Sequence, residues 1–165
     1  MGYMGSGKST IGKLLAKKLK WGFIDLDQYI EKRTGKKITK IFEKHGEIKF
    51  REIEHKCLKR LLNKDKLVIA LGGGTPCFYN NIDLINKNGT LVYLKVNVDI
   101  LAERLLKDKR KRPLIRNLNE TQLKYFIKKA LKKRVSVYKQ ADFYINIKNQ
   151  NVKDIIDKIW KKIVI

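Results

Sequence analysis

The sequence has few of the features that mark secreted, membrane-spanning or multidomain proteins. It contains two cysteines, Cys57 and Cys77, and two prolines, which are too few for a disulfide framework or a proline-rich linker. No charged-then-apolar leader opens it, and no apolar run is long enough to mark a membrane span. We therefore expect a cytoplasmic protein without a membrane partner, in which residues 1–165 form a single domain. A monomer is a separate expectation, which these absences do not establish.

Acidic residues are scarce as well. The chain has 39 Lys and Arg residues against 16 Asp and Glu residues, which gives a formal net charge of +23. Such a charge is typical of nucleic-acid-binding proteins. However, the lysines are spread from Lys8 to Lys162 and far outnumber the arginines, as drift in the composition of a whole proteome would produce. We expect no nucleic-acid partner, and a basic surface that attracts small anionic substrates.

A phosphate-binding loop is the clearest motif that is present. Residues 2–9 fit the pattern G-x-x-x-x-G-K-[ST]. Glycines let backbone N–H groups turn towards phosphate oxygens, Lys8 adds a positive charge, and Ser9 offers a hydroxyl group to Mg²⁺. A helix follows at once, since apolar residues recur at helical spacing at Ile11, Leu14, Leu15 and Leu19. The motif therefore predicts a nucleoside-triphosphate site.

Very little sequence stands before this loop. A phosphate loop normally follows a buried apolar strand in the middle of a parallel sheet, yet only Met1 precedes Gly2. Loss of that central strand would expose hydrogen-bonding edges and remove a layer of core. We expect the true start to lie several residues upstream of Met1, and a weakened protein is the alternative.

Apolar runs alternate with helical stripes along the chain, without an internal repeat or a low-complexity block. This alternation is typical of an α/β fold in which helices cover both faces of a parallel sheet. We predict strands at 23–25, 67–71, 91–95 and 143–147. We predict further helices at 46–62, 98–106, 120–138 and 152–163.

Two carboxylates stand at the end of the first predicted strand. If the backbone stays extended through this stretch, Asp25 and Asp27 point to the same side. Beside a phosphate loop, such a pair can hold Mg²⁺ and orient or deprotonate an attacking hydroxyl group. The alternative, which spacing alone does not exclude, is that Asp27 caps a helix running through Tyr29 and Ile30.

Three glycines and two arginines are further candidates. The glycines at 72–74 follow a predicted strand, and without side chains their backbone amides can contact a ligand. Arg51 and Glu54 can pair at i,i+3 spacing, although spacing alone favours a surface salt bridge of small value. Arg134 lies within the apolar stripe of a predicted helix, where a guanidinium group needs an anion.

A charged segment at 107–118 connects two predicted helices and contains one of the prolines. A solvated connection is the simple interpretation. Phosphoryl transfer, however, needs positive charge at the γ-phosphate and exclusion of water, and a closing loop that carries Arg112 would supply both. We expect this segment to act as a lid.

Together, these motifs resemble those of the shikimate kinase family in order and spacing, over nearly the whole chain. The matching segments are 2–10, 25–27, 50–54 (Phe-Arg-Glu-Ile-Glu), 72–74, 112–114 (Arg-Pro-Leu) and 133–138. Many nucleotide kinases share the phosphate loop, but the combination is far more specific. The resemblance implies a P-loop fold like that of nucleoside monophosphate kinases. It also implies transfer of the ATP γ-phosphate to the 3-hydroxyl of shikimate, on the route to chorismate and the aromatic amino acids.

The resemblance implies a role for each matching residue. Shikimate would be held by Asp27, Arg51, Glu54, Gly73, Gly74 and Arg134, with the substrate-binding helical region at about 27–62. ATP would be held by Gly5, Ser6, Gly7, Lys8, Ser9, Thr10 and Arg112, and Mg²⁺ by Ser9 and, through water, Asp25. Catalysis would rest on Lys8, Asp27 and Arg112. Either Arg104 or Arg110 would stack on adenine.

Residues 75–77, Thr-Pro-Cys, depart from the motif set in a stretch that varies within the family.

Two other functions remain open. A P-loop kinase of another small metabolite, such as gluconate or a nucleoside monophosphate, would keep the phosphate loop but would not need two arginines on one carboxylate. A basic nucleic-acid-binding protein is the lesser alternative.

Overall fold

The glycine loop leads directly into the first helix. The computed structural model describes residues 1–108, 112–148 and 150–164, and in it helix α1 spans Lys8–Leu19. Gly7 occupies the N-cap with φ 88°, a left-handed conformation that favours glycine. Ile11 and Leu15 are buried as the spacing predicts, whereas Leu14 is 42% exposed.

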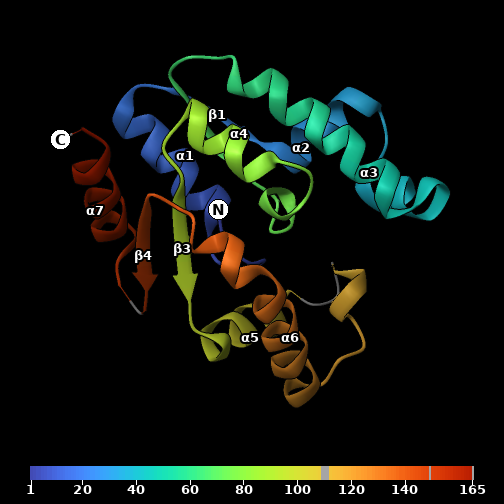
Figure 1. Cartoon of the computed structure of the whole chain (residues 1–165). Coiled ribbons are helices and arrows are strands. Elements are labelled where there is room, and N and C mark those ends of the chain that lie inside the picture. Colours follow the sequence, from blue (N-terminus) through green and yellow to red (C-terminus); the bar gives the residue numbers. More distant parts are fainter. Residues whose placement is uncertain (109–111, 149, 165) are drawn as a thin grey trace.

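Strands and helices alternate along the chain as predicted (Figure 1). The strands are β1 (Gly22–Asp25), β2 (Leu67–Ala70), β3 (Val92–Val96) and β4 (Phe143–Ile147), each within one residue of its predicted bounds. The remaining helices are α2 (Leu26–Thr34), α3 (Ile38–Leu62), α4 (Asn81–Asn88), α5 (Val98–Lys107), α6 (Glu120–Tyr138) and α7 (Val152–Val164). Short 3₁₀ turns occur at Thr75–Cys77 and Pro113–Ile115.

Two helices differ from the sequence-based expectation. The helix predicted from residue 46 is the second part of α3, which already begins at Ile38 and passes through a kink at Gly46. Gly46 has φ 75° and ψ 177°, a conformation that interrupts helical geometry and also the apolar spacing. Helix α4 was not predicted, because its eight residues contain too few turns to establish a clear apolar period.

The strands form two parallel pairs. In the first pair Gly22 lies opposite Leu67, and in the second Val92 lies opposite Phe143. Figure 1 shows β3 and β4 side by side, with α7 next to them. Within residues 1–108, 112–148 and 150–164, no strand pairing joins β2 to β3. The predicted parallel sheet is therefore present as two halves.

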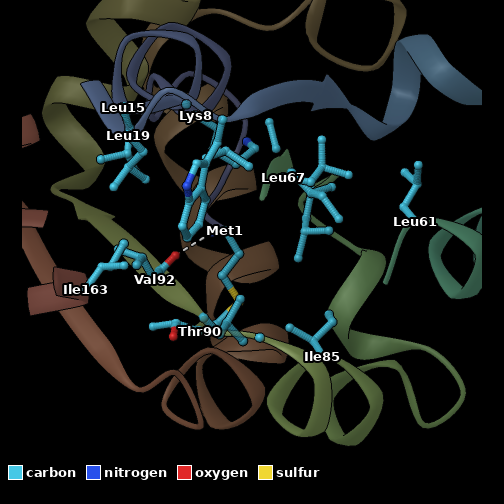
Figure 2. A pocket seen from close by; sticks show the side chains of 18 of the residues that line it. Met1, Lys8, Leu15, Leu19, Leu61, Leu67, Ile85, Thr90, Val92 and Ile163 are labelled. Atoms are coloured by element: carbon cyan, nitrogen blue, oxygen red, sulfur yellow. Dashed lines mark hydrogen bonds between the residues drawn. The ribbon is translucent and has the colours of Figure 1, made fainter. Parts of the chain in front are cut away.

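Met1 lies between these halves. Its amino group donates a hydrogen bond to the Val92 carbonyl, and its own carbonyl accepts one from the Leu94 amide at 2.9 Å. An apolar cavity of about 350 Å³ continues from Met1 between β2 and β3. Figure 2 shows Leu15, Leu67 and Ile163 around it. The cavity thus occupies the place of a central strand.

Helices cover both faces of the β3 half. Along β3, Tyr93 packs into a buried cluster with α2, α3 and α4, whereas Leu94 and Val96 pack into a second cluster with α1, α5, α6 and α7. This alternation follows from the two-residue period of a strand.

Across the described part of the chain, no helix is both long and apolar enough to cross a membrane.

The buried amino group of Met1 predicts a pH dependence of stability. Burial lowers its pKa from 8.0 to about 5, and the Lys8 charge acts in the same direction. Between these pH values the unfolded chain binds a proton that the folded chain does not. The free energy of unfolding should therefore rise with pH from 5 to 8, by at most about 1.4 kcal/mol per pH unit from this group.

Urea unfolding between pH 5 and 8 measures this slope. The chain with Met1 retained, verified by mass, should be compared with its Nα-acetylated form, in which no amine titrates. Acetylation should reduce the slope, and equal slopes for the two forms would show that the amine is not buried as described.

Candidate active site

The phosphate loop holds a desolvated lysine. The Lys8 ammonium group donates to the Tyr3 carbonyl at 3.0 Å. Burial lowers its pKa from 10.5 to about 8, while the nearby carboxylates of Asp27 and Asp25 act in the opposite direction. Lys8 therefore still carries its positive charge at neutral pH, in a setting where water screens it poorly.

Asp25 connects the phosphate loop with α2. One of its carboxylate oxygens accepts a hydrogen bond from the Ser9 hydroxyl at 2.5 Å. The other caps α2 by accepting from the amides of Asp27 at 3.1 Å and Gln28 at 3.3 Å. Because Asp25 is the N-cap, the chain turns into a helix after Asp25, and Asp27 lies in the first helical turn. Asp27 therefore neither continues an extended segment nor caps the helix, which were the two arrangements that the sequence left open. Both carboxylates nevertheless line the same pocket.

The acidity of Asp27 is strongly perturbed. Its side chain is open to solvent on one side, yet the surrounding pocket partly desolvates it. This desolvation raises its pKa from 3.8 to about 6, and the carboxylates of Asp25 and Glu54 act in the same direction. Lys8 and Arg51 oppose the shift, so both cations lie within electrostatic range of Asp27. Its acidity is therefore suited to accepting a proton near neutral pH.

Arg51 is held by two carboxylates and two aromatic rings. It donates to Glu54 at 2.8 Å and to Glu47 at 3.1 Å, and its guanidinium group lies 4.1 Å from the centre of the Phe78 ring and 5.0 Å from that of Phe50. The predicted pairing with Glu54 is confirmed, but it is not a surface salt bridge. The Arg51 side chain is 11% exposed and that of Glu54 is 1% exposed.

The three glycines allow close approach of charged side chains. A Cβ atom on Gly74 would lie 2.6 Å from the Arg51 guanidinium, and one on Gly73 would lie 3.1 Å from that of Arg134. A Cβ atom on Gly72 would lie 3.0 Å from a carboxylate oxygen of Asp27. Larger residues would displace all three groups. Two guanidinium groups from different helices therefore converge on neighbouring residues of this loop.

Arg134 of α6 also lines the pocket. Its guanidinium group lies 5.7 Å from the centre of the Tyr3 ring and interacts with Tyr138, whose hydroxyl donates to the Gly73 carbonyl. Burial raises the pKa of Tyr138 to about 12, so this hydroxyl remains a donor. Within the part of the chain that the structure describes, Arg134 forms no ion pair with a carboxylate.

The segment predicted as a lid is only partly described. Residues 109–111, and with them Arg110, lie outside the described residues, whereas Arg112 lines the pocket and precedes the 3₁₀ turn Pro113–Ile115. Arg112 lies close enough to Lys8 to affect its acidity. Arg104 of α5 donates to the Gly5 carbonyl at 3.2 Å. Arg104 is thus placed at the phosphate loop, while Arg110 stays a prediction.

These groups share one pocket of about 570 Å³. The predicted site residues that line it are Gly5, Gly7, Lys8, Ser9, Thr10, Asp25, Asp27, Arg51, Glu54, Gly73, Gly74, Arg112 and Arg134. Ser6 is not among them, because its side chain is buried beneath the loop and its amide donates to the Tyr3 carbonyl at 3.1 Å. Its contact with ATP therefore remains a prediction.

Sequence reasoning missed several residues of this site, three of which contact its charged groups. Phe78 stacks on Arg51, Tyr3 lies against Arg134, and the Thr75 hydroxyl donates to Glu54 at 2.7 Å. Phe78 and Thr75 belong to the stretch after the glycines, which carried no motif. Tyr3 occupies a variable position of the phosphate-loop pattern. The one available signal was that Thr75 and Phe78 follow Gly74 by one and four residues.

The pocket has two anion-binding ends. At one end are the backbone of the phosphate loop, Lys8 and the start of α1, which together suit a polyphosphate. At the other end, Arg51 and Arg134 suit a carboxylate or phosphate group. Asp27 lies within electrostatic range of cations at both ends. The geometry therefore fits a transfer between two anionic substrates.

Comparisons with known proteins agree with this geometry. The family model described as shikimate kinase matches residues 4–164. A shikimate kinase of Azobacteroides pseudotrichonymphae is 48% identical over 164 residues, which cover 99% of this chain and 96% of that protein.

Solved structures show the same similarity. The shikimate kinase of Bacteroides thetaiotaomicron superposes with a TM-score of 0.94 at 37% identity, covering 100% of this chain and 96% of that one. The shikimate kinase of Acinetobacter baumannii, solved in complex with shikimate, has a TM-score of 0.89 at 35% identity, covering 99% of this chain and 89% of that one. The family model and these relatives span nearly the entire chain, and the chain belongs to the shikimate kinase family.

Proposed function

We propose that this protein transfers the γ-phosphate of ATP to the 3-hydroxyl group of shikimate. One observation supports this substrate above others, namely the convergence of Arg51 and Arg134 on the glycine loop. Two guanidinium groups there can clamp the carboxylate of shikimate, which the ring holds rigidly, whereas gluconate presents its carboxylate on a more flexible chain. The relative solved with shikimate adds support.

The carboxylate clamp orients the acceptor. Arg51 is fixed by Glu54, Glu47 and two aromatic rings, so little side-chain freedom is lost when a ligand binds. Arg134 completes the clamp from α6. Gly73 and Gly74 let the two guanidinium groups pack directly against the loop, so that both groups line the same pocket. A ring held by its carboxylate then presents its hydroxyl groups towards Asp27.

Asp27 binds the reacting hydroxyl and takes its proton, or orients it for attack. A carboxylate whose pKa lies near 6 is ionised at neutral pH and remains a better base than an ordinary aspartate. Lys8 and Arg112 lie at the phosphate end, where positive charge stabilises the transferring phosphoryl group. Asp27 thus supplies proton acceptance, and Lys8 and Arg112 supply charge stabilisation, within one pocket.

ATP lies along the phosphate loop, with its phosphates on the backbone amides from Gly5 to Thr10 and on Lys8. The hydroxyl of Ser9 and the carboxylate of Asp25, which are hydrogen-bonded to each other at 2.5 Å, are hard oxygen donors of the kind that Mg²⁺ binds. Ser9 would hold the ion directly and Asp25 through water. When bound, the ion neutralises phosphate charge. Arg104 lies beside the loop and is our choice for the residue that contacts adenine.

The segment around Arg112 closes over ATP as a lid and excludes water. We also propose that the active protein is a monomer. The expected cytoplasmic location and the absence of a nucleic-acid partner stay predictions.

A coupled assay of ADP release tests the proposed function. Shikimate should support turnover in the presence of ATP and Mg²⁺, while gluconate and AMP should not. Phosphorus-31 NMR of the product should show a phosphate monoester at the 3-position. Faster turnover with gluconate or AMP than with shikimate would overturn the assignment.

Arg134→Lys should weaken shikimate binding about tenfold or more while ATP binding changes little. A lysine keeps the charge but cannot form the two parallel hydrogen bonds of a guanidinium group. Isothermal titration with each ligand measures both affinities. Arg60→Lys, an exposed position of α3, is the matched control. Equal weakening of both ligands by Arg134→Lys would indicate a purely structural role.

A further inference from the structure

A chain of buried hydrogen bonds runs from the substrate pocket into the fold. Glu54 accepts hydrogen bonds on both carboxylate oxygens, from Arg51 at 2.8 Å and from the Thr75 hydroxyl at 2.7 Å. The Thr75 carbonyl accepts from the Asn81 side-chain amide at 2.8 Å. Glu54 is 1% exposed, and Thr75 and Asn81 are fully buried. The three residues belong to α3, a 3₁₀ turn and α4, so the chain joins three elements.

The direction of each hydrogen bond follows from chemistry. A carboxylate only accepts, so the Thr75 hydroxyl donates to Glu54. The Asn81 amide nitrogen donates to a carbonyl, which leaves its oxygen facing the His55 Nδ1 atom at 2.6 Å. His55 therefore carries a proton on Nδ1, and its ring is tilted by 37° against the Tyr79 ring, with the two ring centres 5.0 Å apart.

The Thr75 hydroxyl fixes which way Glu54 faces. Glu54 lies close enough to Asp27 for the two carboxylates to repel each other. Because one carboxylate oxygen of Glu54 is bound to Thr75, the carboxylate cannot rotate freely, and its other oxygen stays directed at Arg51. Gly72 permits this approach, because a Cβ atom there would lie 2.9 Å from the Thr75 hydroxyl and 3.3 Å from the Glu54 carboxylate.

We propose that Thr75 and Asn81 are positioning residues that hold Glu54, and through it the Arg51 guanidinium, in the orientation that binds the acceptor carboxylate. Arg51 has a competing partner in Glu47, whose side chain is 54% exposed. When Glu54 loses its donor, Arg51 shifts towards Glu47 and out of the clamp. This inference rests on the proposed function only in assigning the carboxylate to shikimate.

The test compares Thr75→Val, which has nearly the same shape but no hydroxyl, with Thr75→Ser, which keeps the hydroxyl. Thr75→Val should raise the KM for shikimate about tenfold, the effect of one unsatisfied buried acceptor. The KM for ATP should stay within twofold. Thr75→Ser should restore most of the shikimate affinity. If Thr75→Val does not fold, as judged by thermal melting, Thr75→Ala takes its place.

A double-mutant cycle shows whether Thr75 acts through Arg51. In an Arg51→Lys background, Thr75→Val should change the shikimate KM less than twofold, because the group that it positions is gone. The proposal is overturned if the effects of Thr75→Val and Arg51→Lys on the shikimate KM are fully additive. It is also overturned if the Thr75→Val and Thr75→Ser variants have equal shikimate KM values, or if Thr75→Val raises the KM for ATP as much as that for shikimate. Failure of the parent chain to turn over shikimate would instead overturn the proposed function.

Discussion

Asp27→Asn should lower turnover with shikimate by about two to four orders of magnitude, which is the range of acid–base assistance. Asn keeps the size and a hydrogen-bonding oxygen but cannot accept the proton of the attacking hydroxyl. ATP binding should persist, since Asp27 does not belong to the phosphate loop. Coupled ADP release measures turnover, and titration with an ATP analogue measures binding.

Loss of activity should not come from loss of folding. The folded-state pKa of Asp27, about 6, lies above its ordinary value of 3.8. The contribution of this group to stability is therefore present below pH 3.8 and lost as pH rises through 6, so that ionised Asp27 destabilises the fold at pH 7. Asn removes that charge, and the melting temperature should stay equal or rise.

Asp83→Asn is the matched control, because Asp83 also lies in the first turn of a helix but is exposed and remote from the pocket. This variant should keep parental turnover. Activity of Asp27→Asn close to that of the parent would remove Asp27 from the catalytic role.

The second large effect concerns the cavity between β2 and β3. Five or six apolar residues added before Met1, the usual length of a strand, should pair with both half-sheets and fill the cavity (Figure 2). Each buried side chain contributes about 1.5–3 kcal/mol. The melting temperature should rise by roughly 10 °C or more, and activity should rise with it.

An extension of equal length made of glycine and serine is the control for this experiment. It lengthens the chain without apolar side chains, so it should raise the melting temperature far less. Thermal melts and the kinase assay on all three forms make the comparison. If the chain beginning at Met1 is already as stable and as active as the apolar extension, the sheet does not need a strand in this place.

The fold was predictable where the sequence repeats a pattern. All four strands were predicted to within one residue, because short apolar runs stand between clear helical stripes. Helix α4 and the kink at Gly46 were not predicted, since each depends on local geometry rather than on a period. The predicted single sheet appears as two halves, with Met1 between them.

The site was predictable where residue type alone signals chemistry. The phosphate loop, the glycine triplet and an arginine on an apolar stripe all line one pocket. The burial of the Arg51–Glu54 pair could not be inferred from i,i+3 spacing, because it depends on Phe78 and Thr75 from a distant segment. Asp27 lies in a helix and not in an extended segment because Asp25 caps α2.

A crystal structure of the chain with ADP, Mg²⁺ and shikimate tests the central claim most directly. The account predicts the shikimate carboxylate between Arg51 and Arg134, its 3-hydroxyl within hydrogen-bond distance of Asp27, and the ADP phosphates on residues 5–10. A carboxylate bound elsewhere, with the 3-hydroxyl directed away from Asp27 and the phosphate loop, would contradict it.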